Sequence, residues 1–124
     1  MSMAYEADLV NQAFIADTNL EDYQYYPVEM NSDEEIILAS DAGDFMLGVL
    51  QNAPDTAGKT CLVAVEGITK AVGGAVIAAG AMVQVGAGGK FVTRTTGVSA
   101  GMAMTPCGAD EELFSLKIMR VQHD

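Results

Sequence analysis

Several short stretches of the sequence approach motifs that perform chemistry. Residues 53–60 nearly form the glycine-rich loop that cradles phosphate, but Ala53 replaces its first glycine. That loop must also lead into a helix whose amide groups bind the phosphate. Residues 60–65 are β-branched and alternating, so we expect a turn between two strands. Residues 86–91 miss the GxGxxG pattern at Phe91, and we expect a hairpin loop there.

Groups for acid–base or hydrolytic chemistry are sparse. The single histidine, His123, is the penultimate residue, and we expect it to be solvated; no GxSxG motif is present. Runs of carboxylates at 21–22, 33–35 and 110–112 could serve a glycosidase or bind a hard cation. They lie beside predicted turns without EF-hand spacing, which favours solvated turn charge. We therefore predict no enzyme, no metal site and no cofactor.

One carrier-type interpretation stays open around Lys70. Residues 66–71, followed by the apolar run 76–83, distantly resemble a lipoyl-carrier domain, which presents a lysine on a hairpin tip of a small β-sandwich. The resemblance is incomplete, because Thr69 stands where such domains carry Asp, and the Met-Lys-Met of biotinyl carriers is missing.

The net charge of −11 is unevenly placed. Residues 1–58 contain twelve carboxylates and no Lys or Arg, whereas residues 59–124 contain five carboxylates and six bases. Binding to nucleic acids or anionic membranes draws on clustered bases, so we expect neither partner. The acidic half indicates either a solvated face or a surface complementary to a basic partner.

Other features of the composition favour one domain made in the cytoplasm. A length of 124 residues fits a single domain with its own core. Cys61 and Cys107 form no metal or redox motif, and we expect unpaired thiols. We see no secretory signal, so synthesis in the cytosol is the default. Residues 71–89 are uncharged, but their six glycines argue against a membrane span.

The elements that must position these residues are short strands. Apolar and β-branched runs separated by turn residues predict strands at 25–30, 35–39, 45–50, 60–65, 68–72, 82–85, 91–95, 98–104 and 113–120. Residues 1–24 lack a clear period, and we interpret them as an N-terminal arm that becomes ordered on a partner. The fold prediction is mainly all-β: a small antiparallel β-barrel or β-sandwich over residues 25–124, preceded by the arm.

The order of these runs resembles the phage capsid cement, or head-decoration, family. Residues 22–30 are similar to its opening strand, and 35–39 followed by 48–54 to its most recognisable phrase. The resemblance continues through residues 59–70, 77–83, 97–104 and 112–119, and so covers about residues 22–120. Residues 1–21 lie outside it.

This resemblance implies a tulip-like β protein without catalysis. It would bind the outer surface of a tailed-phage capsid and bridge neighbouring major capsid subunits, with a trimer as the favoured oligomer. A tail or spike adaptor of the virion is an alternative with the same composition. For the capsid contact we select the apolar residues of the arm and three amphipathic tyrosines, although tyrosine on a strand is as often simple packing: Leu9, Val10, Phe14, Ile15, Tyr23, Tyr25 and Tyr26.

Overall fold

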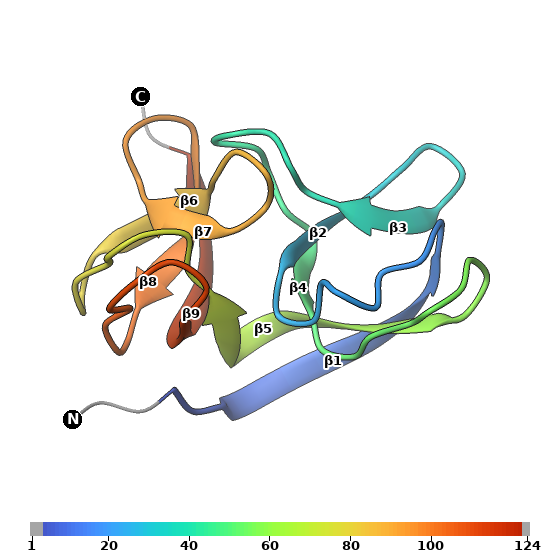
Figure 1. Cartoon of the computed structure of the whole chain (residues 1–124), viewed down its shortest axis with the longest axis horizontal. Coiled ribbons are helices and arrows are strands. Elements are labelled where there is room, and N and C mark those ends of the chain that lie inside the picture. Colours follow the sequence, from blue (N-terminus) through green and yellow to red (C-terminus); the bar gives the residue numbers. More distant parts are fainter. Residues whose placement is uncertain (1–3, 123–124) are drawn as a thin grey trace.

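The computed structural model describes residues 4–122, with side chains described for residues 4–119. Nine strands and no helix are present in this range, which confirms the all-β prediction (Figure 1). The strands are β1 (Ala7–Ala16), β2 (Pro27–Met30), β3 (Glu35–Leu38), β4 (Gly48–Leu50), β5 (Thr60–Val72), β6 (Met82–Val85), β7 (Phe91–Thr93), β8 (Val98–Ala103) and β9 (Leu113–Gln122).

The first five strands form a ring. Hydrogen-bonded neighbours follow the order β1-β3-β2-β4-β5, and β1 also pairs with β5. We call this ring the first barrel. All its pairings are antiparallel except β1 with β3, which run parallel at Ile15↔Glu35 and Ala16↔Ile36. Pro27 opens β2, where its missing N–H is tolerated.

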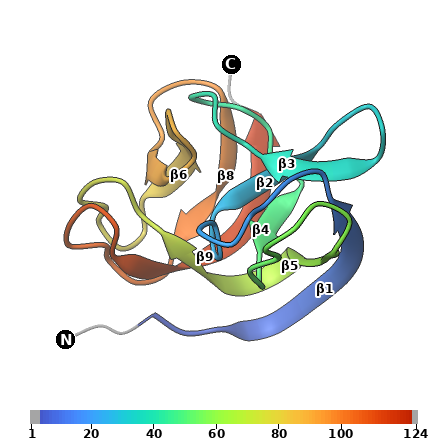
Figure 2. The same ribbon diagram turned by 45° about the vertical axis from the view of Figure 1, so that its right-hand side comes forward.

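The remaining strands form a second ring on the other half of β5. The order continues as β5-β9-β8-β6-β7, and a parallel bridge between Gly73 and Phe91 joins the end of β5 to β7. We call this ring the second barrel. Figures 1 and 2 show the two barrels side by side, with β5 running from one into the other.

Each barrel buries its own core. In the first barrel the core consists of Ala16, Leu20, Val28, Ile36, Leu50, Cys61 and Val63. In the second barrel it consists of Ala39, Met46, Val49, Ala71, Ile77, Val83, Val85, Phe91, Ala100, Ala103, Cys107, Phe114 and Leu116. Cys61 and Cys107 are both free and belong to different cores, in agreement with the expectation of unpaired thiols. Burial raises the pKa of both thiols.

A single strand, β5, replaces the two strands predicted at 60–65 and 68–72. Gly67 joins them into one strand. The chain needs a φ of +101° at this position, which glycine adopts without steric cost. A Cβ at this position would overlap the backbone oxygen of Asp8 on β1. Opposite Gly67, the register of β1 against β5 shifts on both sides of Val10. The close approach at Gly67 therefore lets one long strand serve both barrels.

Residues 7–16 correct one expectation about the arm. They do not wait for a partner to become ordered: β1 pairs with β5 from Ala7↔Ile68 to Ile15↔Thr60, and Ala16 is buried in the first core. Whether residues 1–24 act as a unit separate from residues 25–124 stays a prediction.

The two loops that approach phosphate-binding motifs are turns between strands, as expected. Residues 51–59 connect β4 to β5, and an exposed ion pair between Lys59 and Asp55 at 2.6 Å spans the turn. Between β6 and β7, the Gly86 N–H donates to the Lys90 carbonyl at 2.7 Å and closes a hairpin loop. The uncharged segment 71–89 contributes the end of β5, isolated bridges at Gly73 and Ile77, turns at 79–80 and 87–88, and β6. Among residues 4–122, no helix is long and apolar enough to cross a membrane.

Candidate contact surface

The outer side of β1 and the start of β5 carries exposed apolar side chains. Val10 and Ile15 are each 44% exposed, and Leu62 of β5 is 40% exposed. Ala13 lies directly opposite Leu62, and Ile15 lies opposite Thr60. Directly opposite residues of paired strands project from the same face of the sheet. We call Val10, Ala13, Ile15 and Leu62 the β1 strip.

Carboxylates surround the β1 strip, and two of them hydrogen-bond to each other. Glu35 on β3 shares a side-chain hydrogen bond with Asp17, which follows β1 directly. This bond, some burial and the nearby charges of Asp17 and Asp33 raise the pKa of Glu35 above its ordinary value. Like charges close together disfavour the charged form of a carboxyl group, which is why this pair shifts the pKa of Glu35 upward.

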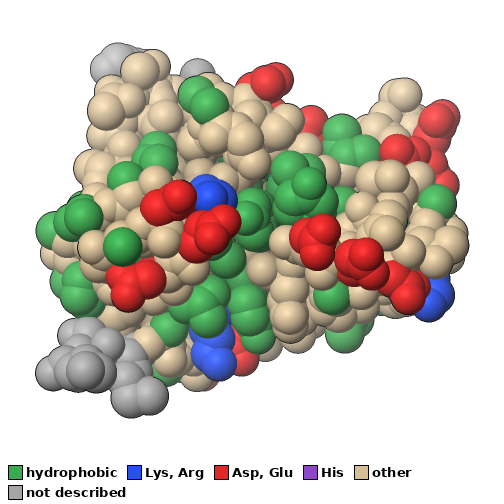
Figure 3. Space-filling view, viewed as in Figure 1, with side chains coloured by type: hydrophobic (Ala, Val, Ile, Leu, Met, Phe, Trp, Pro, Cys, Tyr) green, Lys and Arg blue, Asp and Glu red, His purple; other side chains and the backbone are tan. Residues whose placement is uncertain are grey.

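A second pair of carboxyl groups lies on the other side of the first barrel. Burial and a hydrogen bond with Asp44 raise the pKa of Glu29 on β2 to about 7, with a further contribution from Asp41. Asp44 also accepts the N–H of Phe45, whose ring is 54% exposed. Figure 3 shows acidic side chains across both barrels, with basic ones at isolated places only.

The three tyrosines selected from the sequence lie at the junction of the two barrels. Tyr23 packs against the first core and Tyr25 against the second, and the rings of Tyr23 and Tyr26 meet edge to face with centroids 5.2 Å apart. The Tyr25 N–H donates to the Leu50 carbonyl, and the Tyr25 carbonyl accepts the N–H of Val72. All three are partly buried, and burial raises the pKa of Tyr26. The packing and hydrogen bonds of these tyrosines therefore connect the first barrel to the second.

The structure brings only some of the selected residues to one surface. Val10 and Ile15 belong to the β1 strip, whereas Phe14 is half-buried against the first core and Leu9 is half-buried. Sequence reasoning missed Leu62. The signal was available, because Cys61, Val63 and Val65 alternate on one face and thereby place Leu62 on the other.

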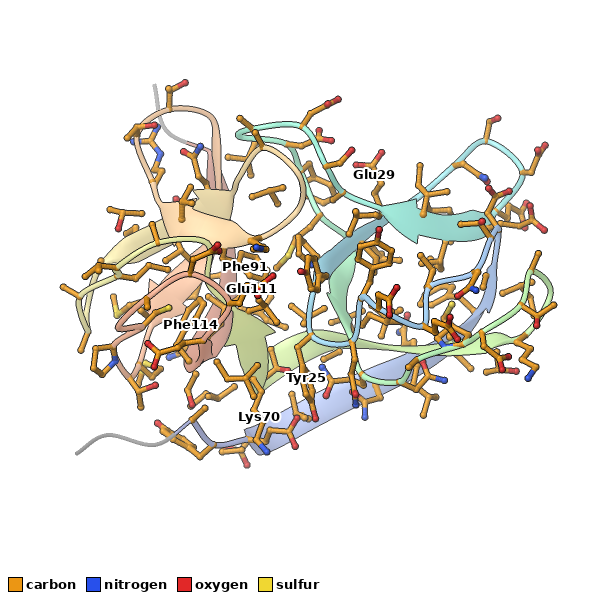
Figure 4. The ribbon with its side chains drawn as sticks, in the orientation of Figure 1. Tyr25, Glu29, Lys70, Phe91, Glu111 and Phe114 are labelled. Atoms are coloured by element: carbon orange, nitrogen blue, oxygen red, sulfur yellow. The ribbon has the colours of Figure 1, made fainter. Side chains whose placement is uncertain are left out.

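Lys70 does not have the position that a carrier lysine requires. It lies within β5 opposite Ser115 of β9, not on a hairpin tip (Figure 4). The carrier interpretation is therefore not supported by the fold. Lys90 is held by Asp110 at 2.9 Å and Glu111 at 3.2 Å. The part of the chain that the structure describes encloses no pocket and gathers no set of three potential metal ligands. His123 lies outside the described residues.

Comparison with known proteins identifies the family. The model of the phage cement protein family matches residues 17–118, which is most of the chain, and the chain belongs to this family. A solved structure with a similar fold is that of the head fiber gp8.5 N base in bacteriophage phi29, with a TM-score of 0.66 and 20% sequence identity. The similarity covers 93% of this chain and 99% of that one. A search of curated proteins gave no match.

Membership of this family makes the chain a structural protein of the phage virion, associated with the capsid. The family resemblance stated from the sequence is thereby confirmed. The family model begins at residue 17, directly after β1. The β1 strip thus lies mostly in a part of this chain that the family model does not cover.

Proposed function

We propose that this protein binds the outer surface of a tailed-phage capsid and stabilises the shell by bridging neighbouring major capsid subunits. Membership of the cement family supports this proposal, and the observation that carries it is the exposed β1 strip within an acidic half of the chain. Apolar side chains that remain exposed together on a small protein mark an interaction site more often than isolated ones do. The proposed action is binding, without catalysis.

Electrostatics supports a basic patch on the capsid as the partner surface. The twelve carboxylates of residues 1–58 have no Lys or Arg among them. Complementary charge speeds encounter and fixes orientation, and it excludes partners of like charge. The proposed contact residues are Val10 and Ile15 together with Leu62, and Leu9, Phe14, Tyr23, Tyr25 and Tyr26 stay as predicted contributors from their partly exposed surfaces.

Bridging requires that one molecule or oligomer of this protein contacts more than one capsid subunit. Several weak contacts made at once give a far higher avidity than each contact alone. A trimer would multiply the contacts in this way. Sedimentation velocity of the purified protein tests the trimer independently of capsid binding.

The function is tested by mixing purified protein with undecorated heads of the phage that encodes it, and by measuring occupancy with cryo-electron microscopy. We expect saturable density on the outer surface and heads that resist heating to a higher temperature. Density confined to tails would support the adaptor alternative, and no density on either would contradict the proposal.

The role of the β1 strip is tested with a matched pair of variants. Val10→Ser combined with Ile15→Ser should lower the apparent affinity for heads by at least about tenfold, since two buried aliphatic contacts are lost. Val76→Ser is the control, because Val76 is 72% exposed in the second barrel. Equal occupancy for both variants would exclude the strip from the contact.

A further inference from the structure

The edge of β1 that faces away from β5 is open. Ala16 directs both its main-chain groups toward the β5 side: its N–H donates to Lys59 at 2.9 Å and its carbonyl accepts from Gly58 at 2.8 Å. The next residue, Asp17, donates instead to Ile36 of β3 at 3.0 Å. Main-chain groups of successive residues point to opposite edges of a strand. Those of Asn11 and Ala13 therefore point away from β5.

Within the described chain, nothing pairs with this edge at residues 9–14. β3 reaches β1 only at Ile15 and Ala16. Proteins usually protect such an edge from pairing with another chain by placing Pro or a charged residue, often Lys, on it. Here residues 9–16 contain no charged residue and no Pro, and residues 10–13 are exposed. The edge thus offers unpaired donors and acceptors without the usual protection.

Carboxylates stand at both ends of this edge. Glu6 and Asp8 lie at the start of β1, and Glu66 of β5 lies opposite Val10. Asp17 and Glu35 lie at the other end, joined by their hydrogen bond. From Asp8 to Asp17 the strand spans about 30 Å, since each residue adds about 3.3 Å.

This arrangement of charge disfavours a second copy of the chain as the occupant. Two β1 strands paired antiparallel about their centres would place the Asp8 end of one copy beside the Asp17 end of the other. Carboxylates would then face carboxylates at both ends, and like charges across a strand pair destabilise it. A strand with a basic residue near each end would instead neutralise both groups.

We propose that the open edge of β1 accepts an extended strand of the capsid protein, with an apolar centre and a Lys or Arg toward each end. The added strand would lie beside Asn11 and Ala13 and continue the line of β3. Main-chain hydrogen bonds supply affinity in this mode of recognition, and side chains supply specificity. This inference rests on the proposed function and specifies how the contact is made.

Residue-level hydrogen exchange of the wild-type protein, free and bound to undecorated heads, tests the proposal. In the free protein the amides of Asn11 and Ala13 should exchange fast, while those of Gln12 and Phe14, which face β5, should be protected. On heads, Asn11 and Ala13 should slow by at least about tenfold. If wild type binds heads but the amides of Asn11 and Ala13 still exchange fast, the strand proposal is wrong and the proposed cement function stands. If wild type does not bind heads, the proposed cement function is itself contradicted.

Concentration separates the capsid strand from a second copy. The exchange of Asn11 and Ala13 in the free protein should not change as its concentration is raised. Protection that develops without heads would show that another copy occupies the edge and would overturn the proposed occupant.

A proline at position 13 blocks the open edge specifically. Ala13→Pro removes an N–H that β5 does not use, so the fold should persist, but apparent affinity for heads should fall at least about tenfold. Ala13→Ser keeps the N–H and should bind as wild type. Equal binding of both variants would contradict the proposal; if Ala13→Pro proves unfolded, the exchange experiment decides.

The predicted basic ends are tested with isosteric neutral variants. Asp8→Asn and Asp17→Asn should each weaken binding several-fold and reduce its dependence on salt concentration. Glu112→Gln in the second barrel is the control and should change neither. If all three variants behave alike, the flanking carboxylates do not select the partner.

Discussion

The two barrels share β5 but differ in what they bury. The second core contains Phe91 and Phe114, whose rings meet edge to face with centroids 6.1 Å apart. The fully buried residues of the first core are aliphatic or Cys, and its aromatic contributors, Phe14 and Tyr23, remain partly exposed. Aromatic side chains bury the largest apolar areas. The second barrel therefore has the larger buried apolar core.

The barrels also differ in how they treat charge. In the second barrel Lys90 forms ion pairs with both Asp110 and Glu111. The first barrel has one exposed ion pair, Lys59 with Asp55, but two pairs of its carboxyl groups hydrogen-bond to each other: Glu29 with Asp44 and Glu35 with Asp17. Proteins depart from good packing and charge balance mainly at functional sites. The contrast favours the second barrel as the support and the first as the contact half.

The largest expected effect comes from the second core. Phe114→Ala should lower the free energy of unfolding by about 3–5 kcal/mol, because it leaves a cavity beside Phe91. Urea unfolding followed by circular dichroism measures the loss. Leu62→Ala on the β1 strip should cost about 1 kcal/mol or less, since the side chain is already 40% exposed. Similar losses for the two variants would remove the distinction between support and contact halves.

A second effect tests the close approach that joins the barrels. Gly67→Ala should cost about 2–4 kcal/mol, combining strain at a positive φ with overlap on the Asp8 oxygen. Gly58→Ala is the matched control, because Gly58 has a φ of +91° with nothing within 4 Å of the added Cβ. It should show only the backbone cost of about 1–2 kcal/mol. The difference in unfolding free energy measures the contact between β1 and β5.

Much of this fold could be predicted from local sequence. Alternation and turn residues predicted the positions of β2 to β9 within a few residues, except that β5 was predicted as two strands, and the prediction at 82–85 coincides with β6. The turns at 53–59 and 86–90 followed from Gly, Pro and Asp chemistry. Local patterns succeed here because each strand buries one face.

The parts that sequence reasoning missed depend on contacts distant in the chain. β1 shows no alternation, since most of its residues are exposed and a bulge near Asp8, at a φ of +54°, interrupts its register. The continuity of β5 through Gly67 depends on its contact with Asp8 of β1, which lies about sixty residues earlier in the chain. The tyrosines were selected as amphipathic candidates for the capsid contact, and only the tertiary structure shows that they lie between two cores.

The smallest expected effect concerns the carboxyl pair of Glu29 and Asp44. In the folded protein the pKa of Glu29 is about 7, above its ordinary value of 4.5. The folded state thus keeps a proton that the unfolded state has released. The stabilising contribution is complete below pH 4.5, falls as the pH rises toward 7, and is lost above that value.

Replacing Glu29 by Gln should remove this pH dependence, because Gln stays neutral and can still hydrogen-bond to Asp44. At pH 8 the variant should be more stable than wild type by about 1 kcal/mol or less, since solvent screens a partly exposed pair. At pH 5 the two proteins should unfold at nearly the same urea concentration. Glu21→Gln, in the exposed turn after β1, should leave the difference between pH 5 and pH 8 unchanged. If wild type and Glu29→Gln had the same unfolding free energy at both pH 5 and pH 8, the adjacent carboxyl groups of the first barrel would cost no stability. The two barrels would then differ only in the cores that they bury.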